Sequence, residues 1–152
     1  MASCNLYECL REATAVEVLQ GDCRYELANG RRVDARKRVL LDATPSILIL
    51  HINRTAWQLS GVQKIHTHVD FPFDLEVGAF QNDEAQAACK YSLCSVVAHH
   101  GHQMSGGHFT AYGRGSAASH TWFQFNDARV THATQDEVAG AQAYILLYER
   151  RL

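Results

Sequence analysis

The chain has 152 residues, 47% hydrophobic and 20% charged, which is enough apolar material for a packed core and excludes a disordered chain. Its formal net charge of -2 comes without a basic cluster, which excludes a nucleic-acid binder, and no apolar run reaches the roughly 18–20 residues that span a bilayer. The five cysteines include no C-x-x-C pair, which indicates a reducing compartment, the cytosol or nucleus.

The first third of the chain predicts one helix and one hairpin. Apolar residues at helical spacing predict a short amphipathic helix over residues 5–19, which Gly21-Asp22 ends. Asn29-Gly30 is the strongest hairpin signal in the chain, because tight hairpin turns need the left-handed backbone that these two residues tolerate. The arms of this hairpin are predicted at residues 23–27 and 32–41.

The rest of the chain predicts strands separated by short connections. Residues 47–52 form an unbroken apolar run that is typical of a strand buried on both faces. Further strands are predicted at residues 65–73, 91–99, 109–112, 122–125 and 143–148, with polar or glycine-rich connections at 58–63, 81–86, 101–107 and 113–119. A capping box at residues 134–137 begins a helix of one or two turns. The predicted fold class is α+β with a largely antiparallel sheet.

Two segments carry residues suited to catalysis. His108 follows Gly106 and Gly107, and another chain can approach it closely because glycine has no Cβ atom. Asn126 and Asp127 end a neighbouring predicted strand. An oxygen there can accept a ring N–H of His108 and hold the imidazole in one orientation, as the third member of a Cys-His-Asn triad does.

Two other interpretations compete for the same residues. Histidines crowd one loop and could bind a metal: His99, His100, His102 and His108. No carboxylate or thiolate stands near them at the spacing of known zinc ligands, so a metal-dependent hydrolase is the weaker interpretation. Taken by themselves, His108 and Asn126 also fit purely structural roles.

The order of motifs along the chain resembles that of ubiquitin-specific proteases. Residues 106–112 (Gly-Gly-His-Phe-Thr-Ala-Tyr) are similar to the family's Gly-His-Tyr-x-Ala-Tyr. Residues 122–130 are similar to its Trp-Tyr-x-Phe-Asp/Asn-Asp-x-x-Val. Shorter matches occur in the family's order at residues 9–10, 17–25, 35–38, 45–54, 64–72 and 143–148. Each match alone is weak, but the ordered series covers nearly the whole chain and is specific.

The resemblance implies the C-terminal half of a papain-like catalytic domain, residues 1–152. A partial finger hairpin is expected at about residues 1–45, and a palm of mostly antiparallel sheet with short helices at about residues 46–152. His108 would be the general base and Asn126 its orienting partner, with Asp127 in a supporting role.

The resemblance also implies a substrate-binding slot. Gly106 and Gly107 would line the slot that receives the Gly-Gly tail of ubiquitin, and Tyr112 would contribute to substrate binding. The loops at residues 56–63 and 100–107 fall where the family has two loops that flank this slot.

The implied activity is thiol-dependent hydrolysis of the isopeptide bond after the C-terminal glycine of ubiquitin. Ubiquitin and ubiquitinated proteins are the expected partners, and no cofactor is needed. The family's nucleophile stands in an Asn-x-x-Cys setting that none of the five cysteines has. We therefore expect the missing N-terminal half of the catalytic domain to supply it, and the chain alone to be inactive. The alternative is a catalytically inactive ubiquitin-binding fragment or pseudo-enzyme.

Two departures from the family pattern have consequences. Glu26 and Asn29 occupy the positions of a C-x-x-C pair in the family's zinc ribbon, so zinc is not expected. Arg54-Thr55-Ala56-Trp57 replaces the common Arg-Phe. This arrangement is similar to that of a mitochondrial-outer-membrane member, which adds association with that membrane to the cytoplasmic or nuclear expectation.

Overall fold

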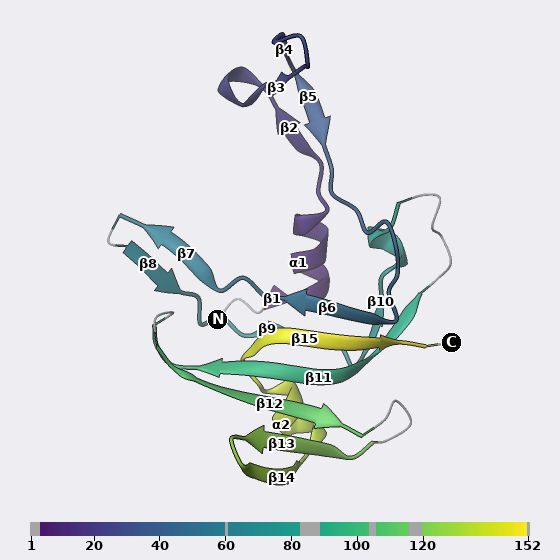
Figure 1. Ribbon diagram of the computed structural model, residues 1–152, viewed down its shortest axis with the longest axis vertical. Coiled ribbons are helices and arrows are strands. Elements are labelled where there is room, and N and C mark those ends of the chain that lie inside the picture. The colour runs from purple at the N-terminus through teal and green to yellow at the C-terminus, as the bar shows by residue number, and fades with distance from the viewer. Residues whose placement is uncertain (1–3, 60, 83–88, 104–105, 116–119, 152) are drawn as a thin grey trace.

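The main body of the protein is a seven-stranded sheet (Figure 1). The computed structural model describes residues 4–59, 61–82, 89–103, 106–115 and 120–151. The strand order is β14-β13-β12-β11-β15-β6, with β10 also pairing with β11, and every pairing is antiparallel. The strands are β6 (Ile47–His51), β10 (Asp74–Glu76), β11 (Lys90–His100), β12 (His108–Arg114), β13 (Trp122–Asn126), β14 (Arg129–Ala133) and β15 (Ala143–Arg150).

Smaller elements surround this sheet. The helices are α1 (Leu6–Ala13) and α2 (Gln135–Ala139), and the 3-10 turns are η1 (Gly21–Cys23) and η2 (Gly78–Phe80). One parallel pair joins β1 (Cys4–Asn5) to β9 (Val69–Asp70). The antiparallel pairs are β2 (Glu17–Leu19) with β5 (Ala35–Lys37), β3 (Tyr25–Glu26) with β4 (Arg32–Val33), and β7 (Thr55–Gln58) with β8 (Gly61–Lys64).

Capping boxes begin both helices, as predicted for α2. The Thr134 hydroxyl accepts from the Glu137 amide at 3.2 Å, and the Glu137 carboxylate accepts from the Thr134 amide at 2.7 Å. The first helix is shorter than the predicted span of residues 5–19. It ends at Ala13, and residues 17–19 form β2 instead, because β-branched Val18 suits a strand.

A two-tiered hairpin built from β2–β5 and β3–β4 stands away from the sheet (Figure 1). Its turn contains Asn29-Gly30 as predicted, and Gly30 has a left-handed φ of 80°, although the paired arms are shorter than expected. Leu6 of α1 is 97% buried in the core of the main sheet (3% exposed), so this helix packs on the sheet rather than on the hairpin. The division near residue 45 into finger and palm remains a prediction.

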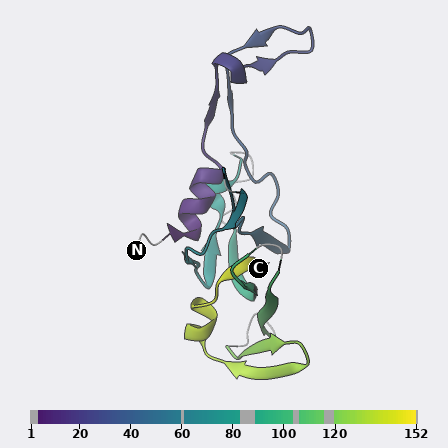
Figure 2. The same ribbon diagram turned by 90° about the vertical axis from the view of Figure 1, so that its left-hand side faces the viewer.

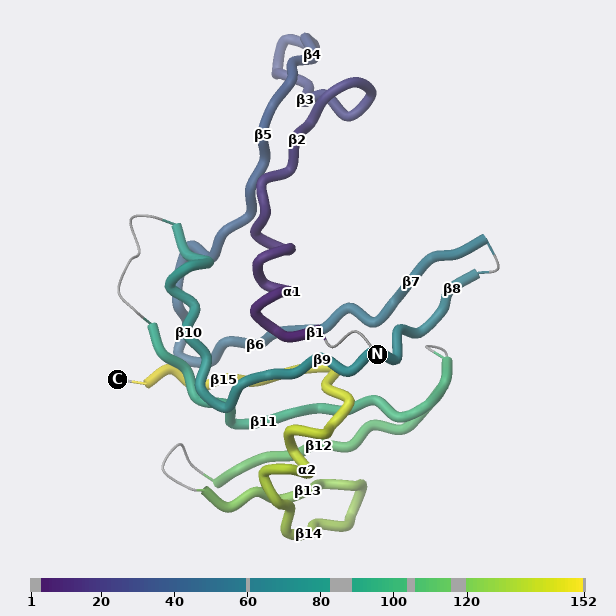
Figure 3. Tube along the Cα trace, turned by 180° about the vertical axis from the view of Figure 1, so that it is seen from behind, coloured from purple at the N-terminus to yellow at the C-terminus, as the bar shows by residue number. Residues whose placement is uncertain are grey.

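The core lies on one face of the sheet. Helices α1 and α2 and strand β9 cover this face, as the view from behind and the view along the sheet show (Figures 2 and 3). Fully buried side chains point toward them from the sheet: Leu75, Tyr91, Val96, Leu146 and Tyr148.

The opposite face of the sheet is apolar and uncovered by any described element. One row of paired residues crosses this face from β14 to β6, because residues that are paired across neighbouring strands point to the same side of the sheet. The row consists of Val130, Phe125, Ala111, Val97, Ile145 and His51. We call this surface the exposed sheet face and define it by its most exposed apolar residues: Ile47, Ile49, Phe109, Phe125 and Val130, which are 43–61% exposed. The prediction that residues 47–52 are buried on both faces is therefore wrong in this chain, since β6 is an edge strand.

Other connections also differ from the prediction. The predicted loop at residues 58–63 belongs to the β7–β8 hairpin, and only Val69 and Asp70 of residues 65–73 form a strand. Strands β10 and β14 were not predicted. Much of the predicted polar insert at 81–86, the end of the turn at 113–119 and the middle of the loop at 101–107 lie outside the described residues.

Candidate catalytic site

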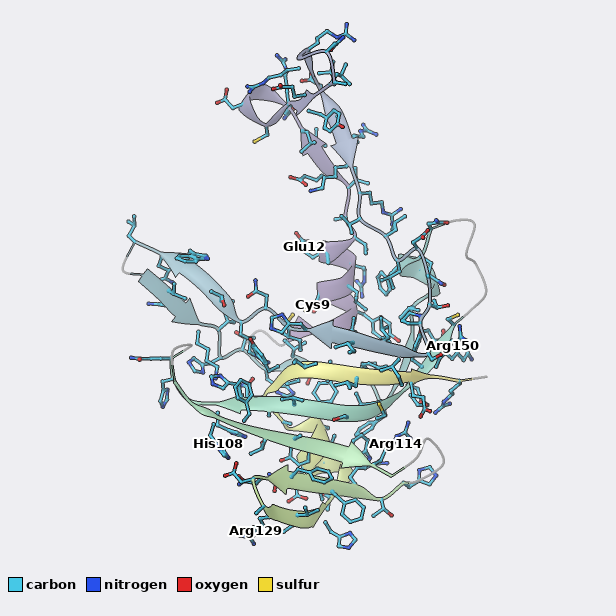
Figure 4. All side chains as sticks on the ribbon, viewed as in Figure 1. Cys9, Glu12, His108, Arg114, Arg129 and Arg150 are labelled. Carbon is cyan, nitrogen blue, oxygen red and sulfur yellow. The ribbon has the colours of Figure 1, made fainter. Side chains whose placement is uncertain are left out.

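His108 and Asn126 lie side by side at the ends of two neighbouring strands. His108 is the first residue of β12, at the opposite end from Arg114 (Figure 4), and Asn126 is the last residue of β13. Because β12 and β13 are antiparallel, the start of one meets the end of the other. The His108 Nε2 atom is 2.7 Å from the Asn126 Oδ1 atom. The expected contact between the two side chains is therefore present.

This contact assigns different tasks to the two ring nitrogens. An amide oxygen can only accept, so Nε2 carries the proton that it donates to Asn126. In the neutral ring, Nδ1 then has a free lone pair and can take a proton. The side chain of His108 is 47% exposed, so a reacting group can approach it.

Asp127 contributes charge rather than a direct hydrogen bond. It begins the two-residue connection between β13 and β14 and has a left-handed φ of 50°, which aspartate tolerates. Its Oδ2 atom is 4.0 Å from His108 Nε2, beyond hydrogen-bonding distance, and the side chain is 81% exposed. Asp127 therefore lies beside the ring as an exposed carboxylate whose charge is screened by water.

The glycines before His108 differ in what they tolerate. A Cβ atom added to Gly107 would lie 2.3 Å from the backbone oxygen of His100 and 2.3 Å from Nε2 of His99. A Cβ atom added to Gly106 would meet no atom within 4 Å. Of these two positions, only Gly107 excludes a side chain, because the two ends of the turn are in contact there.

The side chain of His99 packs beneath this turn, a role that the sequence did not indicate. It is 6% exposed, and its ring packs against Phe109 with 4.6 Å between centroids and against Tyr144 with 6.0 Å. Burial lowers the pKa of His99, and the positive charges of Lys64 and His100 add to the effect. A neutral buried imidazole at the end of β11 thus supports Gly107.

The lowered pKa of His99 predicts how stability depends on pH. The unfolded chain protonates this side chain near pH 6.5, whereas the folded chain resists protonation. The stabilising contribution is present above about pH 6.5 and is lost as pH falls toward the lowered pKa. His99→Phe keeps the aromatic packing, so its stability should decrease less between pH 7.5 and 5.5 than that of the wild type, measured by urea unfolding. His120→Phe, at an exposed position, is the control. An unchanged pH dependence in His99→Phe would contradict the assignment.

The four loop histidines do not converge on one point. His100 Nε2 is 2.8 Å from the Thr110 hydroxyl, His102 lies beside His66 with ring centroids 5.7 Å apart, and His108 bonds to Asn126. Among the described residues, no three His, Cys, Asp or Glu side chains are arranged to hold a metal ion. This geometry does not support a metal-dependent hydrolase.

Comparison with known proteins identifies the family. The sequence profile named "Ubiquitin carboxyl-terminal hydrolase" matches residues 3–148. The chain belongs to this family.

Relatives in the ubiquitin carboxyl-terminal hydrolase family match nearly the whole chain. Ubiquitin carboxyl-terminal hydrolase 3 of Homo sapiens is 34% identical over 152 residues, covering 95% of the chain and 28% of that relative. Ubiquitin carboxyl-terminal hydrolase 2 of Gallus gallus is 37% identical over 150 residues, covering 95% of the chain and 40% of that relative. The chain thus spans less than half the length of either relative.

Solved structures agree with the fold. A chain of the SAGA DUB module bound to monoubiquitin has a TM-score of 0.85 and 31% identity, over 98% of this chain and 33% of its own length. A chain of the SAGA DUB module bound to ubiquitin aldehyde has a TM-score of 0.83 and 30% identity, over 98% of this chain and 34% of its own length. The predicted fold class is confirmed: α+β, with the mostly antiparallel sheet of the papain-like hydrolases.

Tyr112 is not brought to the pair formed by His108 and Asn126. It lies four residues further along β12, which corresponds to roughly 13 Å of strand. Its hydroxyl accepts a hydrogen bond from Gln124 Nε2 at 3.1 Å. Burial raises the pKa of Tyr112, and the charge of Glu137 adds to this shift. Its contacts are those of a partly buried residue beside the core.

Two further features of the described residues concern the cysteines and the helices. All five cysteines are free thiols, although the sulfur atoms of Cys4 and Cys9 are only 3.5 Å apart. No helix of the described residues is both long and apolar enough to cross a membrane.

Proposed function

We propose that this chain supplies the general base and its orienting partner to a thiol-dependent deubiquitinase. The observation that carries the proposal is the 2.7 Å contact between His108 Nε2 and Asn126 Oδ1. It holds the ring in the orientation and tautomer in which Nδ1 can exchange a proton with a thiol. Membership of the ubiquitin carboxyl-terminal hydrolase family supports the reaction class.

The proposed reaction has two stages. Nδ1 of His108 takes the proton of a cysteine thiol, and the resulting thiolate attacks the carbonyl carbon of the C-terminal glycine of ubiquitin. His108 then gives its proton to the departing lysine amine, and the C–N bond breaks to leave a thioester. Water hydrolyses the thioester with His108 again as base. Asn126 holds the ring throughout, and Asp127 has a supporting role beside it.

We propose that the thiol comes from outside the residues described here. None of the five cysteines stands in an Asn-x-x-Cys setting. We propose that the preceding half of the catalytic domain carries the nucleophile and covers the exposed sheet face. Isolated proteins rarely leave so continuous an apolar surface in water, and this face extends to Phe109, next to His108.

The proposed substrate is ubiquitin joined to lysine on proteins or on other ubiquitins. Two of the similar solved structures are modules bound to monoubiquitin and to ubiquitin aldehyde. Gly106 and Gly107 are proposed to line the path of the ubiquitin tail, since a turn without side chains leaves room for an extended chain. The free thiols support a reducing compartment, the cytoplasm or nucleus. Association with the mitochondrial outer membrane rests only on the sequence Arg54-Thr55-Ala56-Trp57.

The test compares the chain alone with the chain fused behind the preceding catalytic-domain segment of the Gallus gallus relative. The substrates are ubiquitin with a C-terminal aminocoumarin and ubiquitin vinyl methyl ester. The chain alone should release no fluorophore and form no adduct, because an imidazole without a thiolate has no nucleophile to activate. The fusion should do both, with the adduct on the cysteine of the added segment.

Other outcomes separate the alternatives. Stoichiometric labelling of the chain alone, mapped to one of its own cysteines, would overturn the proposal. A fusion that binds ubiquitin but neither cleaves nor labels would favour the second candidate function, an inactive ubiquitin-binding module.

A further inference from the structure

Lys64 reaches from the β7–β8 hairpin to the turn that precedes His108. It is the last residue of β8, and its Nζ atom is 2.8 Å from the backbone oxygen of His99 and 2.8 Å from that of Gly101. An ammonium group has three N–H donors, so one side chain bonds both carbonyls. Both hydrogen bonds are charge-assisted and are therefore stronger than neutral ones.

The hairpin that carries Lys64 has no strand partner in the sheet. Within the described residues, β7 and β8 pair only with each other, and Figure 1 shows them extending away from the sheet. At the base, Nη1 of the buried Arg54 donates to the backbone oxygen of Thr67 at 2.8 Å. Lys64 adds a direct bond between the hairpin and the turn.

The contacts of Lys64 affect the position of His108 through the turn that precedes it. Gly101 accepts from Lys64 and also packs against the far end of the turn, where a Cβ atom added to Gly101 would lie 2.9 Å from the backbone oxygen of Gly106. Gly107 packs still more closely on the ring of His99, whose carbonyl also accepts from Lys64. His108 follows directly, so a shift of Gly101 or His99 moves the backbone that carries the imidazole.

We propose that Lys64 is a positioning residue that fixes the turn before His108 and couples it to the β7–β8 hairpin. Its hydrogen bonds go to backbone carbonyls rather than to the imidazole, so it acts through the turn. A ligand that displaces the hairpin thereby changes the orientation of His108. The consequence for catalysis rests on the proposed function, whereas the coupling of hairpin and turn does not.

Hydrogen exchange of backbone amides in the 152-residue chain tests the coupling. In Lys64→Met, the amides of residues 99–103 and 106–109 should exchange at least about tenfold faster, because the turn opens more often without the ammonium group. The amide of Val96, in the middle of β11, should keep its rate. Lys64→Arg should recover most of the protection, since a guanidinium also donates to two carbonyls.

Lys90→Met is the matched control. Lys90 begins the same strand, β11, and its ammonium pairs with Glu76 at 3.2 Å, far from the turn. This variant should leave the turn unchanged. Unchanged exchange of the turn in Lys64→Met would overturn the proposal, as would equal acceleration of the turn and Val96, which would mean a global loss of stability.

A second measurement uses the wild-type chain and does not depend on folding of a variant. The ammonium protons of Lys64, followed by ¹⁵N NMR at low temperature, should exchange with water more slowly than those of Lys37. Lys37 forms an exposed ion pair with Glu17, where its side chain is 60% exposed. Equal exchange rates would overturn the proposal. Neither measurement needs a nucleophile, so both are independent of whether the proposed hydrolysis occurs.

Discussion

Replacing His108 by alanine is expected to lower kcat/KM of the catalytically complete fusion. The decrease should be roughly 10²–10⁴-fold or more, since general acid–base catalysis usually contributes a rate factor of that size. Asn126→Ala should cost less, because the amide orients the ring but exchanges no proton. Asp127→Asn should have the smallest effect of the three, since its carboxylate is 4.0 Å from the ring and largely exposed. The measurement is steady-state cleavage of ubiquitin aminocoumarin.

His120→Ala controls for the loss of an imidazole, because His120 is exposed and lies outside the strands that hold the site. It should leave the rate unchanged. Equal and mild effects of His108→Ala and Asn126→Ala would show that another residue is the base. Unfolding in urea should be nearly unaffected by His108→Ala, since this half-exposed side chain contributes little to the core.

Replacing Gly107 by alanine is expected to damage both the fold of the turn and the activity. The added methyl group would lie 2.3 Å from a backbone oxygen, which cannot move without shifting the strand. Overpacking of this kind costs roughly 1–3 kcal/mol. The displaced turn should also carry His108 away from Asn126 and lower kcat/KM.

Gly106→Ala is the matched control for this substitution. It adds the same methyl group one residue earlier, where no atom lies within 4 Å. Its free energy of unfolding should stay within about 0.5 kcal/mol of the wild type. If Gly106→Ala impairs cleavage of ubiquitin while leaving stability intact, the methyl group obstructs the substrate rather than the fold. If Gly107→Ala is as stable and active as the wild type, the close contact with His99 and His100 does not exist in solution.

The sequence predicted the site better than its surroundings. His108 and Asn126 could be paired because each stands beside short motifs, and strands β12 and β13 follow each other closely enough to be neighbours. The role of Lys64 could not be predicted, because it depends on β8 lying against the end of β11, a contact across 35 residues that no local pattern encodes. The role of His99 depends on packing against Gly107 and Tyr144, which the sequence does not show. The sequence alone indicated His99 only as one of four histidines that could bind a metal.

The errors in the fold have a similar origin. The apolar run of residues 47–52 predicts burial on both faces, yet β6 has one neighbour and leaves Ile49 61% exposed. A hydrophobic pattern shows that a surface is to be covered, but not which polypeptide covers it. Residues 17–19 were assigned to the helix because their strand partner, β5, is separated from them in sequence by the hairpin.

The position of β15 determines when this domain can finish folding. Strand β15, the last of the described strands in chain order, lies between β6 and β11, so both of these strands are synthesised before the strand that joins them. Until residues 143–150 have left the ribosome, β6 has no partner and β11 lacks one edge. Such pairings between distant segments make folding slow. During synthesis β6 and one edge of β11 are therefore unpaired, which leaves them open to association with other chains and to binding by chaperones.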